Sequence, residues 1–72
     1  MTELGRARDR AGVVAEFDVE RGLGTIESDD GDRHLFHCIE IADGSREIAV
    51  GAEVRFDELR KFGRVEAANV RT

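Results

Sequence analysis

The chain has 72 residues, which is one domain at most, and no apolar run approaches the roughly 20 residues of a membrane helix. Its net charge of −5 is concentrated in residues 16–33, which hold seven acidic against two basic side chains. Phosphate binding needs positive potential, so this segment disfavours it. The N-terminus lacks a signal-peptide pattern, and the single cysteine, Cys38, excludes an internal disulfide. Together these features favour a small acidic protein of the reducing cytoplasm.

The first ten residues show no hydrophobic period. We therefore expect a flexible N-terminal tail over residues 1–10 and one domain over residues 11–72. From Ala11 onward, apolar and polar residues alternate, which is typical of strands. The alternation divides the first strand, residues 11–18, into two faces: Val13, Ala15 and Phe17 on one, and Val14, Glu16 and Asp18 on the other.

Two further strands follow after turns. Residues 19–21 and Gly22 make the first turn, and the second strand runs over residues 22–28. Gly24 within it indicates a bend or a bulge. Residues 29–32 are a strong turn signal, and the third strand covers residues 33–38. Alternation in these two strands predicts two faces: Leu23, Thr25, Glu27, Leu35 and His37 on one side of their strands, and Gly24, Ile26, His34 and Phe36 on the other.

The second half of the chain begins with a longer connection, residues 39–51, with room for a helical turn near its start. Three apolar residues of this connection are predicted to cover one end of the core: Ile41, Ile48 and Val50. The fourth strand covers residues 53–59 with Val54 and Phe56 inward, and the fifth covers residues 64–70 with Ala68 and Val70 inward. Five short strands with one long link after the third predict an all-β, five-stranded antiparallel barrel of the OB-fold type. A small open sheet and an SH3-like barrel are the alternatives.

No set of residues predicts an enzyme. His34, His37 and Cys38 lie close together, but on a strand the two histidines point to opposite faces, and no further Cys or His completes a metal site. The acidic turn at 29–32 lacks the hydrophobic shelter that perturbs a catalytic carboxyl. We therefore expect no catalytic residues, no metal and no cofactor.

Several motifs occur in the order and spacing of a known family, over about residues 11–70. They are Gly12-Val13-Val14, Phe17, Arg21-Gly22-Leu23-Gly24-Thr25-Ile26, Asp30-Gly31, His37, Ile41, Gly51, Val54-Arg55-Phe56 and Ala68-Asn69-Val70. In these motifs the chain resembles the cold-shock domain. The resemblance implies binding of single-stranded RNA or DNA, in which bases stack on aromatic side chains of the first three strands inside a basic surround.

This chain departs from the family pattern at nearly every stacking position. The family reads Lys-Trp-Phe-Asn, then Lys-Gly-Phe-Gly-Phe-Ile, then Val-Phe-Val-His-Phe. The corresponding positions that differ here are Ala15, Glu16, Leu23, Thr25, Leu35 and Cys38. Only His37 keeps its identity, with Phe17 retained beside the lost Trp. Each stacked base is worth about 1–3 kcal/mol, whereas micromolar binding amounts to only about 8 kcal/mol. We therefore expect weak binding at the usual surface, or a displaced site.

The residues that the resemblance and the charge pattern nominate for nucleic acid are Phe17, Arg21, Leu23, Thr25, Leu35, His37, Lys61 and Phe62. The displaced site would combine the fourth turn with the tail: Arg60, Lys61, Phe62 and Arg64, with Arg6, Arg8 and Arg10. The alternative for these charges is an ordinary solvated hairpin tip and tail.

A second reading is a protein-interaction module that reuses the barrel. The altered sheet face forms a modest apolar patch rimmed by acids: Leu23, Thr25, Leu35, His37 and Cys38. A protein partner with a basic rim would suit it, although such a patch can also be free of any partner. We expect a monomer with no membrane association.

Overall fold

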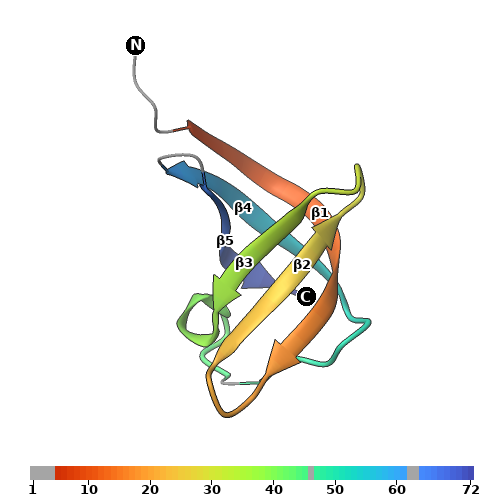
Figure 1. The fold of residues 1–72 in the computed structure, drawn as a ribbon, viewed down its shortest axis with the longest axis vertical. Helices are drawn as coiled ribbons and strands as arrows, with labels where there is room; N and C mark the ends of the chain where they lie inside the picture. The colour runs from red at the N-terminus through yellow and green to blue at the C-terminus, as the bar shows by residue number, and fades with distance from the viewer. Residues whose placement is uncertain (1–4, 46, 62–63) are drawn as a thin grey trace.

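The strands close into a barrel, as predicted. A computed structural model describes residues 5–45, 47–61 and 64–72. In these ranges the strands are β1 (Gly5–Asp18), β2 (Leu23–Ser28), β3 (Arg33–His37), β4 (Glu53–Lys61) and β5 (Arg64–Arg71). They form a closed barrel in the order β1-β2-β3-β5-β4 (Figure 1). Neighbouring strands are antiparallel, except that a parallel contact between Leu35 and Glu66 closes the barrel between β3 and β5.

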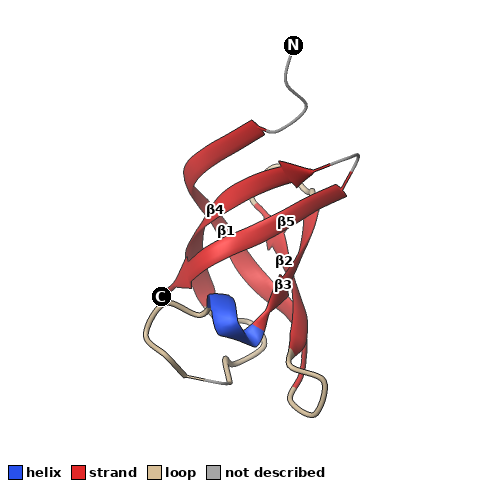
Figure 2. Cartoon of the chain, turned by 90° about the vertical axis from the view of Figure 1, so that its left-hand side faces the viewer, coloured by secondary structure: helices blue, strands red, loops and turns tan. Residues whose placement is uncertain are grey.

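The connection between β3 and β4 closes one end of the core. It starts with a 3₁₀ turn, Cys38–Glu40, and continues as a long loop (Figure 2). Ile41 is buried and bridges to Val70 of β5, and Ile48 packs against the core from the loop. Val50, which was also predicted to cover this end, is exposed. No helix in the described ranges has the length and apolar character that crossing a membrane requires.

The core is small and comes from every strand. Its buried apolar residues are Val14, Ile26, Phe36, Ile41, Val54, Phe56, Ala67 and Val70. The predicted alternation is confirmed in β2, β3 and β4, where Ile26, Phe36 and Phe56 point inward. Gly24 is needed for this packing, because a Cβ there would lie 2.7 Å from two ring atoms of Phe36.

The alternation in β1 is interrupted by a bulge. The register to β2 shifts between Val14 and Glu16, so Ala15 is an extra residue in the strand. An extra residue moves the following side chains to the other face. Val14 is therefore buried while Phe17 packs against the core, and Val13 is 41% exposed. The prediction that Val13, Ala15 and Phe17 share one face is wrong for this reason.

A similar break occurs in β5. Asn69 has a left-handed backbone with φ of 53°, a conformation that asparagine tolerates better than most residues. The turn of the chain at Asn69 places Ala67 and Val70 in the core, whereas Ala68 is only half-buried. The prediction of Ala68 as an inward residue is therefore wrong by one position.

β1 begins at Gly5, so it takes in residues that were expected to form a tail. Gly5 pairs with Arg60 and Arg6 with Leu59, which continues the ladder between β1 and β4. Asp9 has φ of 59°, and the register is irregular between Ala7 and Arg10. The strand thus replaces the predicted tail over residues 5–10, and residues 1–4 lie outside the description.

Candidate nucleic-acid interface

Four of the nominated residues share the outward face of β1, β2 and β3 with Glu16. We call this the β1–β3 face: Glu16, Leu23, Thr25, Leu35 and His37. Glu16 pairs with Thr25 across β1 and β2, while Leu23 pairs with His37 and Thr25 with Leu35 across β2 and β3. Paired residues on adjacent strands have neighbouring side chains. The face predicted from alternation and the resemblance is therefore present as a geometric unit.

The chemistry of this face differs from a stacking platform. Leu35 is 38% exposed, Leu23 and Thr25 are half-buried, and His37 is exposed. The Thr25 hydroxyl is buried and makes no hydrogen bond among the described residues. His37 is the one planar ring among the five, so the face offers a single surface on which a base could stack.

Acidic side chains surround the same region. An open groove over it is lined by Leu23, Gly24, Thr25, Leu35 and residues 16–21. Glu16, Asp18 and Glu20 are exposed there. Arg21 is the nominated cation, but its Nε lies 3.7 Å from the Asp18 carboxylate. Three exposed carboxylates and one cation therefore line this groove, which is a local excess of negative charge.

Phe17 is turned away from the β1–β3 face. Its ring stacks on Phe36 with centroids 5.9 Å apart and an interplanar angle of 17°. The Phe17 side chain is half-buried and packs against the core. A base could therefore contact only the part of the Phe17 ring that lines the groove. The bulge at Ala15 explains why Val14 and Phe17, three residues apart, both face the core.

The remaining nominated residues lie elsewhere. Lys61 ends β4, at the opposite end of the barrel from the turn between β1 and β2 that carries Arg21 (Figure 1). Phe62 lies outside the described residues. The structure therefore does not bring Arg21 and Lys61 into one site.

Strand pairing does unite two groups of cations that are far apart in sequence. The first residues of β1 run beside the last residues of β4, and Lys61 pairs with Arg64 of β5. We call these backbone positions the basic end: Arg6, Arg8, Arg60, Lys61 and Arg64. From the sequence, these residues were assigned to two separate segments, the fourth turn and an N-terminal tail, because the extension of β1 to Gly5 was not predicted.

Sequence reasoning missed a buried polar cluster inside the barrel. His34 is fully buried and packs on Phe56 with ring centroids 4.9 Å apart. Its Nε2 lies 3.9 Å from Oε2 of Glu58, which is only 2% exposed. Arg10 donates to Glu58, and the Nε of Arg60 lies 2.9 Å from Glu58 Oε2. The available signal was an acid at an inward position of β4, since Glu58 follows Val54 and Phe56 in the alternation.

Arg10 also fixes the turn between β2 and β3. Its Nη2 donates to Asp30 Oδ2 at 2.8 Å. Burial alone would lower the pKa of Arg10, but the carboxylates of Asp30 and Glu58 outweigh it and raise the pKa. The pKa of Asp30 is lowered, chiefly by the hydrogen bond from the Ser28 hydroxyl. This acidic turn is thus held by internal contacts.

A second exposed cluster ties the bent part of β1 to its neighbours. The Asp9 carboxylate accepts bonds from Arg55 Nε and Nη2, both at 2.9 Å, and from Arg71 Nη2 at 3.0 Å. The hydrogen bond from Arg55 is the main reason that the pKa of Asp9 is lowered, with Arg71 adding to it. Within the described ranges, no three His, Cys, Asp or Glu side chains gather in a way that could hold a metal ion.

Comparisons with known proteins agree with this geometry. Residues 10–72 match the family described as the 'Cold-shock' DNA-binding domain. Cold shock-like protein CspC of Bacillus cereus is 38% identical over 60 residues, which cover 82% of this chain and 92% of that protein. The protein of the same name from a designated strain of that species matches equally. A match over nearly the whole chain, on a closed five-stranded barrel, shows that the chain belongs to the cold-shock DNA-binding domain family.

Proposed function

We propose that this protein binds single-stranded nucleic acid in the cytoplasm, weakly, and mainly through phosphate contacts at the basic end. Membership of a family described as DNA-binding supports the ligand class. The observation that carries the weak affinity is the chemistry of the β1–β3 face, where Glu16 and Thr25 are register partners and His37 is the one ring. The proposal needs no catalytic group.

The loss of rings decides the strength of binding. A stacked base contributes about 1–3 kcal/mol, so removing four or five stacking partners eliminates most of what micromolar binding requires. Carboxylates at Glu16, Asp18 and Glu20 oppose the remaining attraction. The usual surface therefore contributes little to the affinity for an oligonucleotide.

The basic end supplies the charge that the β1–β3 face lacks. Pairing of β1 with β4 sets Arg6 beside Leu59 in the same part of the barrel as Arg60 and Lys61. Several cations along one ribbon attract a phosphate backbone without reading bases. This mode of binding is expected to depend strongly on salt and weakly on sequence.

The test compares two charge reversals of equal size. Lys61→Glu removes a cation at the basic end, and Arg21→Glu removes one beside the β1–β3 face. We expect Lys61→Glu to weaken binding of a short single-stranded oligonucleotide at low salt by about tenfold, and Arg21→Glu to have a small effect. A larger loss with Arg21→Glu would return binding to the usual face. No measurable binding by the unmodified protein at low salt would contradict the proposal.

A further inference from the structure

Alternation in β1 places Val13 on the outside of the barrel, between the buried Gly12 and Val14, where it forms an exposed apolar floor. A groove of about 500 Å³ runs over β1 between the end of β2 and the start of β4. We call it the Val13 groove, lined by Ala11, Gly12, Val13, Glu27, Ser28, Asp29, Glu53, Val54 and Arg55. Val13 lies at its centre, because it pairs with Glu27 on one side and with Glu53 on the other. This site is separate from both the β1–β3 face and the basic end.

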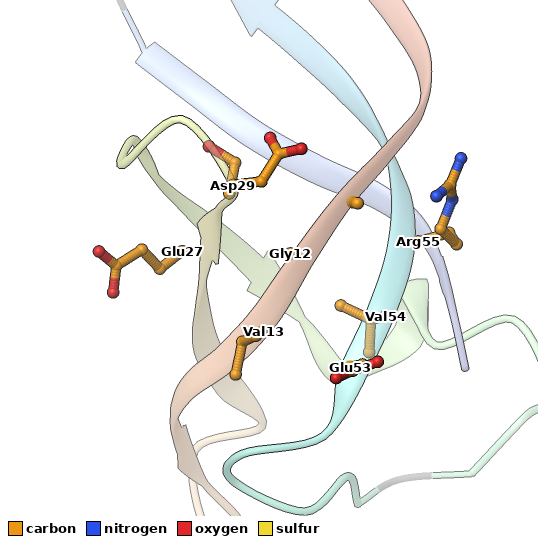
Figure 3. A pocket seen from close by; sticks show the side chains of 9 residues that line it. Gly12, Val13, Glu27, Asp29, Glu53, Val54 and Arg55 are labelled. Carbon is orange, nitrogen blue, oxygen red and sulfur yellow. The ribbon is translucent and has the colours of Figure 1, made fainter.

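The rim of the groove is negative. Glu27 and Asp29 extend from the β2 side, while Glu53 lies on the β4 side (Figure 3). All three are exposed, and none makes an ion pair with another described residue. Arg33 stands opposite Glu27 across β2 and β3, but it forms no ion pair in the described ranges. The Glu27 and Glu53 carboxylates therefore remain available to a cationic ligand, while Asp29 adds negative charge to the rim and interacts electrostatically with Arg10 and Arg55.

The one cation in the groove is already neutralised. Arg55 lies at the far rim in Figure 3, and its guanidinium donates to both oxygens of the Asp9 carboxylate. The Asp9 carboxylate also raises the pKa of Arg55, so the pair is held together at ordinary pH. Among the residues that line the groove, the one cation is therefore ion-paired with Asp9 and also has Asp29 as an electrostatic neighbour, whereas Glu27 and Glu53 have no such partner in the described ranges.

The backbone in the groove cannot accept an added strand. β1 is hydrogen-bonded to β2 on one side and to β4 on the other along this stretch. Gly12 does not open the floor either, because its missing Cβ points inward, 2.7 Å from Cγ2 of Ile26. A ligand must therefore be recognised by its side chains, through an apolar contact on Val13 and charges toward Glu27 and Glu53.

We propose that the Val13 groove binds a short cationic, apolar segment of a protein partner. An apolar centre with a rim of one charge is the arrangement of a small docking site. Charge complementarity selects Lys or Arg in the partner and excludes nucleic acid, whose phosphates the three carboxylates repel. A pocket of this size accommodates a few side chains.

The test uses a defined probe, a short capped peptide of alternating arginine and valine. We expect weak binding that is lost when arginine is replaced by glutamate in the peptide, and reduced when valine is replaced by serine. Chemical-shift changes should include the methyl groups of Val13. Absence of binding by the arginine–valine peptide would overturn the proposal.

Matched variants separate the groove from a general attraction to an acidic protein. The pair Glu27→Gln with Glu53→Gln removes two charges from the rim, and the pair Glu20→Gln with Glu47→Gln removes two exposed charges elsewhere. We expect the rim pair to weaken binding by about tenfold and the control pair by less than twofold. Equal losses in both pairs would overturn the proposal.

Two further measurements test the apolar contact at Val13 and the identity of the occupant. Val13→Thr keeps a β-branched side chain and the net charge, and we expect it to weaken binding about threefold through the lost methyl contact; an unchanged affinity would contradict an apolar floor. Sedimentation of the protein alone identifies a second copy as the occupant if it reveals a dimer that the rim pair dissociates, which would contradict a separate partner. Neither experiment uses an oligonucleotide, so their failure is distinguishable from failure of the proposed function.

Discussion

Glu16 of β1 lies directly opposite Thr25 of β2 on the outside of the barrel. In the family pattern both positions are aromatic, so a pair of rings has been replaced by a carboxylate and a hydroxyl that is itself buried without a partner in the described part of the chain. The strand frame of the family is present, with different side chains at these two positions. If these side chains cause the weak binding that we propose, substitution at the two positions should reverse it.

Restoring rings should restore binding. The double substitution Glu16→Trp with Thr25→Phe adds two stacking surfaces and removes one repulsive charge. At about 1–3 kcal/mol per stacked base, we expect affinity for a pyrimidine oligonucleotide to rise at least tenfold. The new Trp also provides a fluorescence signal for the titration. Ile39→Phe, an exposed aromatic away from the face, is the control, and an equal gain there would show that any added ring suffices.

Gly24 should not tolerate a side chain. An alanine Cβ would lie 2.7 Å from the Phe36 ring and 2.8 Å from the carbonyl oxygen of Glu16. We expect Gly24→Ala to lower the free energy of unfolding by about 1–3 kcal/mol through overpacking. Denaturant melts measure the change. In a double-mutant cycle with Phe36→Leu, the double variant should lose less unfolding free energy than the sum of the losses in the two single variants. A loss equal to that sum would mean that contact with the Phe36 ring does not cause the destabilisation by Gly24→Ala.

Removing Arg10 should destabilise the barrel from within. Glu58 is buried and pairs with Arg10, His34 and Arg60. Without Arg10, the described partners of its carboxylate are the buried His34 and the exposed Arg60. We expect Arg10→Met to cost about 2 kcal/mol in denaturant melts. Arg33→Met removes an exposed arginine and should cost less than about 0.5 kcal/mol. Equal effects of the two substitutions would exclude a structural role for the buried cluster.

Acid should weaken the clamp at Asp9. The hydrogen bond from Arg55 holds the folded-state pKa of Asp9 below its unfolded value of about 3.9. The unfolded state therefore binds more protons in acid, and this contribution is present above pH 4 and is lost as pH falls through the folded-state pKa. Asp9→Asn keeps a residue that tolerates positive φ while removing the charge.

The measurement is the thermal midpoint of both proteins against pH. We expect Asp9→Asn to melt below the parent protein at neutral pH and the gap to narrow as pH falls below about 4. Glu47→Gln, an exposed change outside the clamp, should run parallel to the parent at all pH values. A gap for Asp9→Asn that stays constant with pH would rule out the carboxylate as its cause.

Most of the barrel could be predicted from the sequence because inward and outward side chains alternate without interruption in β2, β3 and the core part of β4. Ile26, Phe36 and Phe56 face the core as their alternation requires. The alternation did not predict the inward residues where one residue interrupts the regular strand geometry. This happens at the bulge next to Val14 in β1 and at Asn69 in β5. Neither break leaves a mark in the hydrophobic pattern, since small residues such as Ala15 and Ala68 fit either face.

The candidate site was predictable in part for the same reason. The β1–β3 face follows from alternation, but the direction of Phe17 relative to Val13 and Val14 depends on the bulge. The basic end required knowing that β1 pairs with β4 as far as Gly5, which is a tertiary contact without a local signal. The Val13 groove was not predicted, because a valine in a pattern of alternating apolar and polar residues is expected to face the core.

The decisive measurement for the proposed binding mode is an NMR titration with a short pyrimidine oligonucleotide at low salt, following the amides of every described strand. We expect weak binding, with the largest shifts at Arg60 and Lys61 and small ones at Thr25, Leu35 and His37. Sub-micromolar binding with its largest shifts on the β1–β3 face, abolished by His37→Ala, would contradict it.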